Sequence, residues 1–131
     1  MLSDRLAEEL VKCFPDKAVQ LHAGRRPAAS VASAHPSWEP IEIWDDEDEL
    51  TVFCGQFTHV HFGNYDEDLS VEQREAQIVS DAISFLEDVF ADRIEFYTMV
   101  FGGGCRPRGS QGKWFWIVQR GPIFVWSGPT V

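Results

Sequence analysis

The segment from Ser70 to Phe90 constrains the fold most, because it predicts one long amphipathic helix. Ser70 with Gln73 three residues later forms a capping box, and acidic residues in the first turns suit the positive helix N-terminus. Apolar residues then recur at helical spacing and trace one broad face, which comprises Ile78, Val79, Ala82, Phe85, Leu86, Val89 and Phe90. A face this wide needs an apolar surface to cover it, so we expect the helix to lie on a sheet.

Alternating apolar residues predict a hairpin of that sheet. Residues 41–44 form its first strand and residues 50–62 its second, while the acidic residues 45–49 form a turn too charged to bury. The expected cross-strand pairs are Asp45 with Leu50, Ile43 with Val52, and Ile41 with Cys54. Gly55 is expected to mark a bulge or a close backbone approach within the second strand, because glycine weakens a strand interior.

Shorter elements flank this hairpin on its N-terminal side. Residues 2–14 predict a helix that Ser3 caps and Pro15 ends, and residues 19–22 predict a short strand. The Ala-, Ser- and Pro-rich segment 24–40 is expected to be a covering loop, held down by Trp38.

Three further strands are expected after the long helix. They are predicted over 93–101, 113–119 and 122–126, with residues 102–112 as a glycine-rich mobile loop. The chain is therefore predicted to be a single α+β domain over residues 1–131. We expect a mainly antiparallel or mixed sheet of about five strands and two helices, in the order α-β-β-α-β-β-β.

The charge of the chain is concentrated in its middle. The net charge is −10 over 131 residues. Residues 39–92 hold sixteen acidic residues against Arg74 alone, a net charge of −15, whereas residues 1–38 carry +1 and residues 93–131 carry +4. This acidity, with a sequence pI near 4.7, argues against nucleic-acid binding through phosphate neutralisation.

Several other classes are also excluded. No apolar run approaches the roughly 18 residues of a transmembrane helix, and the first residues lack the pattern of a secretory signal, so we expect no membrane contact. Three widely spaced cysteines, Cys13, Cys54 and Cys105, argue for reduced thiols in a cytoplasmic protein. The glycine-rich segment 102–112 matches neither the phosphate-binding loop nor the dinucleotide fingerprint, so no cofactor is expected.

A binding function makes the most use of the charge pattern. Consecutive acids focus a negative potential that speeds association with a basic protein, and an exposed aromatic side chain such as Trp44 would anchor it. We therefore expect a small acidic binding protein with a basic protein partner. Bacterial immunity proteins against nuclease toxins resemble the chain in size and charge, although no motif assigns it to that family. The predicted contact residues are Glu42, Trp44, Asp45, Asp46, Glu47, Asp48, Glu49, Asp66, Glu67 and Asp68.

His59 and His61 provide a second hypothesis. They lie two residues apart in an expected strand, so their side chains share one face. Two imidazoles on one face can ligate a metal if Glu42, His22 or His35 supplies a third ligand, which would suit a metal-assisted hydrolase or lyase. Because no established metal motif is present, we favour the alternative that both are ordinary sheet residues and that the chain is not an enzyme.

The basic residues of the glycine-rich segment and the aromatic strands beyond it complete the candidates. Arg106, Arg108 and Lys113 are placed to meet an acidic partner or the acidic part of the chain itself, and they favour the thiolate of Cys105. The strands around 114–116 and 124–126 carry aromatic residues on both faces. One face either forms a homodimer interface, which makes a structural subunit the third hypothesis, or lies under the segment 24–40.

Overall fold

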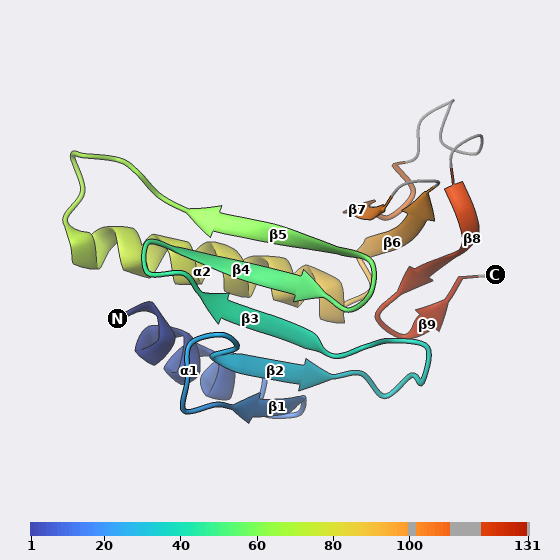
Figure 1. The fold of residues 1–131 in the computed structure, drawn as a ribbon, viewed down its shortest axis with the longest axis horizontal. Coiled ribbons are helices and arrows are strands. Elements are labelled where there is room, and N and C mark those ends of the chain that lie inside the picture. The colour runs from blue at the N-terminus through green and yellow to red at the C-terminus, as the bar shows by residue number, and fades with distance from the viewer. Residues whose placement is uncertain (100–101, 111–118, 131) are drawn as a thin grey trace.

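The computed structural model describes residues 1–99, 102–110 and 119–130, and it shows an α+β fold with two antiparallel sheets (Figure 1). Within these residues no helix is long and apolar enough to cross a membrane. The elements in chain order are α1 (Leu2–Cys13), β1 (Ala18–Leu21), β2 (Ala29–Ala32), β3 (Ile41–Asp45), β4 (Glu49–Cys54), β5 (Thr58–Gly63), α2 (Val71–Phe90), β6 (Ile94–Met99), β7 (Gly103–Pro107), β8 (Gln119–Val125) and β9 (Gly128–Pro129).

The first sheet has the strand order β1-β2-β3-β4-β5, and each strand pairs with its neighbour in an antiparallel arrangement. The predicted register of the β3–β4 hairpin is confirmed at all three expected pairs. The predicted single strand over 50–62 is wrong, because the chain turns at residues 55–57 and returns as β5. Gly55 permits that turn: its φ is +57°, and a Cβ there would lie 2.9 Å from the carbonyl oxygen of Glu39.

The covering loop predicted over 24–40 is also wrong, because this segment contains β2 in the interior of the sheet. Ala29 and Val31 are buried and face the same side as the core residues of β3. The strand is only four residues long and lies among Gly, Pro and Ser residues, so its alternation was too short to stand out. Trp38 is buried as expected, but it belongs to the core between the two sheets.

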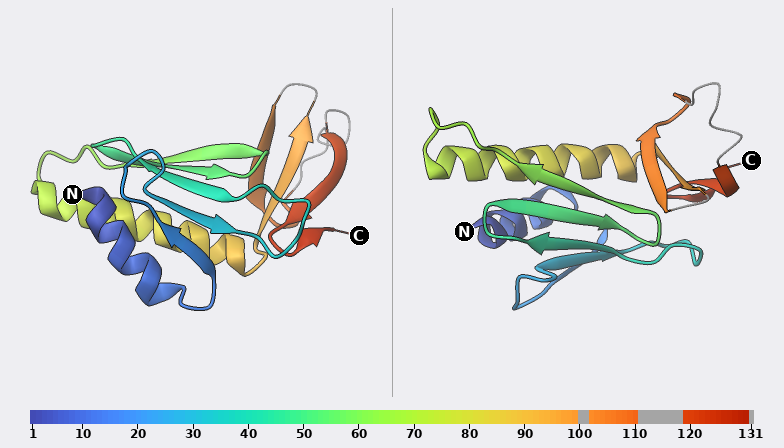
Figure 2. Two further views of the ribbon diagram at one scale, coloured as in Figure 1. Left: turned by 60° about the horizontal axis from the view of Figure 1, so that its bottom comes forward. Right: turned by 45° about the horizontal axis from the view of Figure 1, so that its top comes forward.

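Both helices lie on one face of the first sheet and leave the other face open (Figure 2). The α2 helix begins at the predicted capping box, and most of its predicted apolar face is buried, with Ile83 added to it. Phe85 and Phe90 of that face are partly buried against the core. The α1 helix ends before Pro15, as predicted, and buries Leu2, Leu6 and Leu10. The predicted Ser3 cap is wrong: Met1 is the N-cap, and the backbone N–H of Ser3 donates to a carboxylate of the β3–β4 turn.

The second sheet has the order β7-β6-β8-β9 and stands against one end of the first (Figure 1). The sequence predicted one sheet and a mobile loop over 102–112, but residues 103–107 form β7 and pair with β6. Glycine is needed there for close approach, because a Cβ on Gly103 would lie 2.5 Å from the carbonyl oxygen of Phe57. The strand expected over 113–119 lies outside the described residues up to position 118, and so does Lys113.

An aromatic cluster joins the two sheets. The Trp38 ring packs edge-on against Phe57, Phe96 and Trp126, with ring centroids 4.8 to 5.1 Å apart. Its indole N–H donates to the backbone carbonyl of Val125 at 2.9 Å. Trp126 of the predicted aromatic strands is therefore a core residue, whereas Trp114 to Trp116 lie outside the described residues. Two surfaces away from this cluster remain as candidates for function: the open face of the first sheet and the region around the N-terminus of α2.

Candidate partner-binding surface

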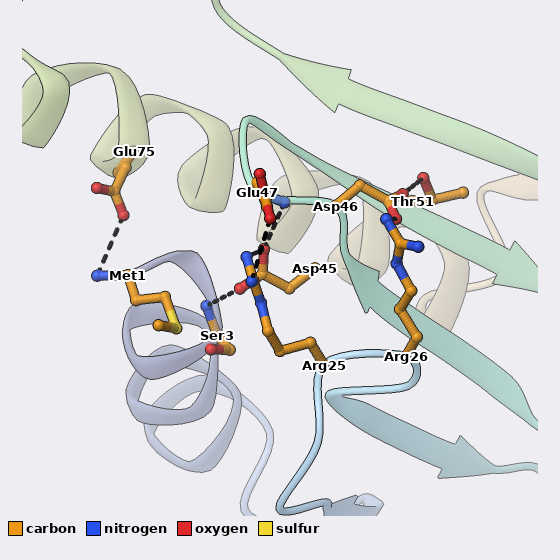
Figure 3. A network of polar contacts seen from close by, with 9 residues as sticks. All are labelled: Met1, Ser3, Arg25, Arg26, Asp45, Asp46, Glu47, Thr51 and Glu75. Carbon is orange, nitrogen blue, oxygen red and sulfur yellow. Dashed lines mark hydrogen bonds and ion pairs between the residues drawn. The ribbon is translucent and has the colours of Figure 1, made fainter.

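Asp45 is buried, although the sequence predicted that the acidic residues 45–49 are too charged to bury. Its carboxylate accepts hydrogen bonds from the guanidinium of Arg25 at 3.1 Å, from the backbone N–H of Ser3 at 3.0 Å and from that of Glu47 at 2.9 Å (Figure 3). A buried carboxylate that is paired and hydrogen-bonded is stable in the folded chain. Asp45 thus ties the start of α1 and the β1–β2 connection to the β3–β4 turn.

The surroundings of Asp45 lower its pKa below the usual value. Burial by itself raises the pKa, because it penalises the charged form. The hydrogen bonds from Arg25, Glu47 and Ser3 favour the charged form and outweigh burial. Asp45 is therefore a structural anion and is not available to a partner.

The neighbouring carboxylates are partly neutralised by the same arginine-bearing connection. Arg25 also lies 3.6 Å from a carboxylate oxygen of Glu47, and Arg26 pairs with Asp46 at 2.8 Å (Figure 3). Asp46 in addition accepts a hydrogen bond from the hydroxyl of Thr51 at 2.6 Å. Arginines of the chain itself thus pair with part of the acidic turn, whereas the sequence predicted that the whole turn contacts a partner.

Glu49 joins the β3–β4 turn to β5 and to the loop that follows it. One carboxylate oxygen lies 3.2 Å from Nδ1 of His61, and the other accepts a hydrogen bond from the Tyr65 hydroxyl at 3.0 Å. The bond to Glu49 raises the pKa of Tyr65, because ionising the phenol would place two negative charges together. Glu49 therefore positions the loop over residues 64–68 beside the turn.

A cavity of about 280 Å³ lies where the β3–β4 turn, the β5–α2 loop and the start of α2 meet. We call it the acidic pocket. It is lined by Leu2, Glu47, Asp48, Asn64, Tyr65, Val71, Arg74, Glu75 and Ile78. Glu75 also pairs with the amino group of Met1 at 3.3 Å (Figure 3). The fold thus brings two residues of the acidic turn to one cavity with Asn64 and Tyr65, which directly precede the predicted contact residues 66–68.

Exposed apolar side chains surround this cavity. Among the described residues, the exposed large apolar side chains are those of Met1, Val11, Leu21, Tyr65 and Val71. Tyr65 and Val71 line the acidic pocket, with 66% and 61% of their surface exposed, and Met1 contacts its Glu75. Exposed apolar residues within a charged rim are typical of a protein interface. Neither Tyr65 nor Val71 is among the contact residues predicted from the sequence.

Asp66, Glu67 and Asp68 are exposed beside the acidic pocket, as predicted for contact residues. Local hydrogen bonds fix the conformation of this loop. The Asn64 side chain accepts a hydrogen bond from the backbone N–H of Asp66, and the Asp66 side chain accepts one from the backbone N–H of Asp68. Within the described residues no ion pair neutralises these three carboxylates. They remain available to a partner.

Glu42 and Trp44 lie apart from the acidic pocket, on the open face of the first sheet. Trp44 is half-buried against Phe53, with ring centroids 4.8 Å apart, so it is not the freely exposed anchor that the sequence suggested. Together with residues of β2 and β4, Glu42 and Trp44 line a groove of about 530 Å³. The predicted contact residues therefore divide into two separate surfaces.

The two histidines of β5 share a face as predicted, with ring centroids 5.0 Å apart. His61 contacts Thr51 and Glu49, while His59 packs against Phe53. Two of the three expected third ligands are engaged elsewhere, since His22 bonds Ser30 and His35 bonds Ser37. In the part of the chain that the structure describes, no three His, Cys, Asp or Glu residues are grouped to hold a metal ion.

The basic residues of the glycine-rich segment do not form one patch. Arg106 pairs with Glu95 at 3.0 Å, and both side chains are largely buried. Arg108 is exposed and donates to the backbone carbonyl of Asp92 at 3.4 Å. The predicted activation of Cys105 is wrong, because the residue lies in β7 and burial raises the pKa of its thiol.

The acidic pocket and the open-face groove are the two candidate sites that this geometry supports. Comparisons with protein-family models, with curated proteins and with solved structures found no match for this chain.

Proposed function

We propose that the chain is a non-catalytic binding protein that recognises a basic protein through the acidic pocket. The observation that carries the proposal is the placement of exposed Tyr65 and Val71 beside unpaired carboxylates. Apolar and aromatic residues supply most of the binding energy at interfaces, and charges around them steer the partner and select it. Tyr65 suits the role of anchor, because its ring is large and its hydroxyl is already held by Glu49.

The rim of the pocket fits a basic partner. Asp48, Glu67 and Asp68 are exposed, and within the described residues no cation pairs with them. Arg25 and Arg26 pair with residues of the acidic turn, and Arg74 lines the pocket. Among the described residues, Asp48 and the loop over residues 66–68 keep carboxylates that no cation pairs with, and they leave a negative field on this side of the pocket. Such a field raises the association rate of a basic protein and weakens with salt.

A matched pair of triple variants tests the proposal. The pocket variant carries Asp48→Asn, Glu67→Gln and Asp68→Asn, and the control variant carries Glu8→Gln, Asp16→Asn and Glu87→Gln. Both lose three negative charges, but the control residues lie away from the pocket. Each immobilised variant is used to capture proteins from an extract of the source cells, and association rates with the captured protein are then measured at several salt concentrations.

We expect a captured protein of basic pI whose association with the pocket variant is about tenfold slower at low salt, with a flatter salt dependence. The control variant should behave like the unmodified chain. Tyr65→Ala should raise the dissociation rate instead, because it removes the anchor and leaves the charge unchanged. Equal binding by both triple variants, or capture of acidic proteins alone, would contradict the proposal.

A further inference from the structure

The open face of the first sheet carries a groove that the proposed function does not use. Residues of β2, β3 and β4 contribute to its lining. The face of the sheet that carries it is turned away from both helices, as the ribbon views show (Figure 2). Its volume of about 530 Å³ is within the usual range for small-molecule sites. It is lined by His22, Pro27, Ser30, Glu39, Pro40, Glu42, Trp44, Phe53 and Gly55.

The walls of the groove are aromatic and apolar. Trp44 and Phe53 come from neighbouring strands, and their rings are tilted by 53° with centroids 4.8 Å apart. Two prolines stand beside them. Tilted aromatic rings of this kind present negative ring faces, which attract a cation that has lost its water.

The charge in the groove is negative. Glu42 lies directly opposite Phe53 in the β3–β4 register, and Glu39 stands at the end of the groove near Gly55. Among the described residues no cation pairs with either carboxylate. Arg25 and Arg26, which directly precede Pro27 of the groove in the sequence, pair with residues of the acidic turn.

Among the described residues, no lysine or arginine cation lies over the ring of Trp44 or Phe53. The side-chain cations placed over aromatic rings in the described residues are Lys17 over Phe90 and Arg106 over Tyr97. Neither of these rings belongs to the groove. The groove thus combines two aromatic rings with two carboxylates, and no cation of the described residues pairs with either carboxylate.

We propose that this groove binds a small organic cation of the substituted-ammonium class. A quaternary ammonium has no N–H groups and needs ring faces, apolar walls and a nearby negative charge, all of which the groove supplies. The proposal is independent of the acidic pocket, which shares no residue with the groove.

Choline and its neutral analogue 3,3-dimethylbutan-1-ol test the assignment, because they have similar shape but differ in charge. Binding is followed by NMR through the indole N–H signal of Trp44, which is identified as the signal that Trp44→Phe removes. Glu42→Gln is the test variant, and Glu87→Gln on the exposed face of α2 is the control. The dispersion of the amide signals in each variant shows whether the fold is kept, so that lost binding is distinguished from unfolding.

We expect choline to produce a saturable shift of the Trp44 signal and the neutral alcohol to bind at least fivefold more weakly. Glu42→Gln should weaken choline binding at least fivefold, and Glu87→Gln should leave it unchanged. The triple variant of the acidic pocket should also bind choline normally, which separates this site from the proposed function.

Three results would overturn the proposal. One is a choline titration without a saturable shift at Trp44, and another is equal binding of choline and the alcohol. The third is tighter binding of a short peptide that contains trimethyllysine than of choline, because the groove would then serve a modified protein partner and not a free small molecule.

Discussion

The acidic segments 45–49 and 64–68 are close in composition, but the structure uses them in opposite ways. Asp45 is enclosed by the chain's own hydrogen-bond donors, and Arg25 and Arg26 cover its neighbours. The loop 64–68 is ordered by bonds to its own backbone and keeps its carboxylates exposed. The difference teaches that charge density alone does not identify a contact surface. Whether a cation from a distant segment reaches the carboxylates decides their role.

Replacing the buried anion should show the largest difference between the two segments. Asp45→Ala removes an ion pair and two backbone hydrogen bonds, so we expect it to lower the free energy of unfolding by about 2–4 kcal/mol. Glu67→Ala, in the exposed loop, should change it by less than about 0.5 kcal/mol. Urea denaturation of both variants measures the contrast. Equal stability of the two variants would show that Asp45 does not anchor the turn.

Acid should reduce the contribution of Asp45 to the free energy of unfolding. The pKa of Asp45 is lower in the folded chain than its usual value, so this group stabilises the fold at neutral pH and loses that contribution as the pH falls through its folded pKa. We expect the difference in stability between the unmodified chain and Asp45→Asn to narrow below about pH 4. Glu95, whose pKa is also lowered, supplies a separate acid-sensitive contribution in both proteins. A difference that stays constant from pH 7 to pH 3 would contradict this account.

The difference between local patterns and contacts with distant residues also explains how much of the fold could be predicted from the sequence. The α2 helix and the β3–β4 register follow from local patterns, namely a capping box and alternating apolar residues, and both are confirmed. The strands β2 and β7 depend on distant partners. Position 103 of β7 requires glycine, because a Cβ there would collide with the carbonyl oxygen of Phe57. The local sequence does not encode this contact with a distant residue.

The candidate site was predicted in part for the same reason. The sequence identified the acidic residues, but the burial of Asp45 depends on Arg25, twenty residues earlier in the chain. Tyr65 and Val71 did carry a signal: each is an apolar residue in a polar segment, and Val71 lies outside the apolar face of α2. Isolated apolar residues beside acidic runs are therefore worth testing as anchors.

The capping box at the end of the exposed loop should contribute to the stability of α2. In the capping box the Ser70 hydroxyl accepts from the backbone N–H of Gln73 at 3.1 Å. Ser70→Ala should therefore cost about 1 kcal/mol of stability. Ser80→Ala, on an exposed mid-helix position, should be neutral or slightly stabilising, because alanine favours helix. Thermal unfolding of the two variants compares them, and an equal loss would mean that the cap does not hold the helix start.

The smallest expected effect tests the contact that joins the two segments. Glu49 raises the pKa of Tyr65 because its carboxylate accepts a hydrogen bond from the protonated phenol. Glu49→Gln removes the negative charge, so the pKa of Tyr65 should fall toward its ordinary value. The chain contains two tyrosines, and an NMR titration with labelled tyrosine follows each ring separately. An unchanged Tyr65 titration would show that the loop and the turn are not coupled through Glu49, and the acidic pocket would then lack the contact that holds its anchor in place.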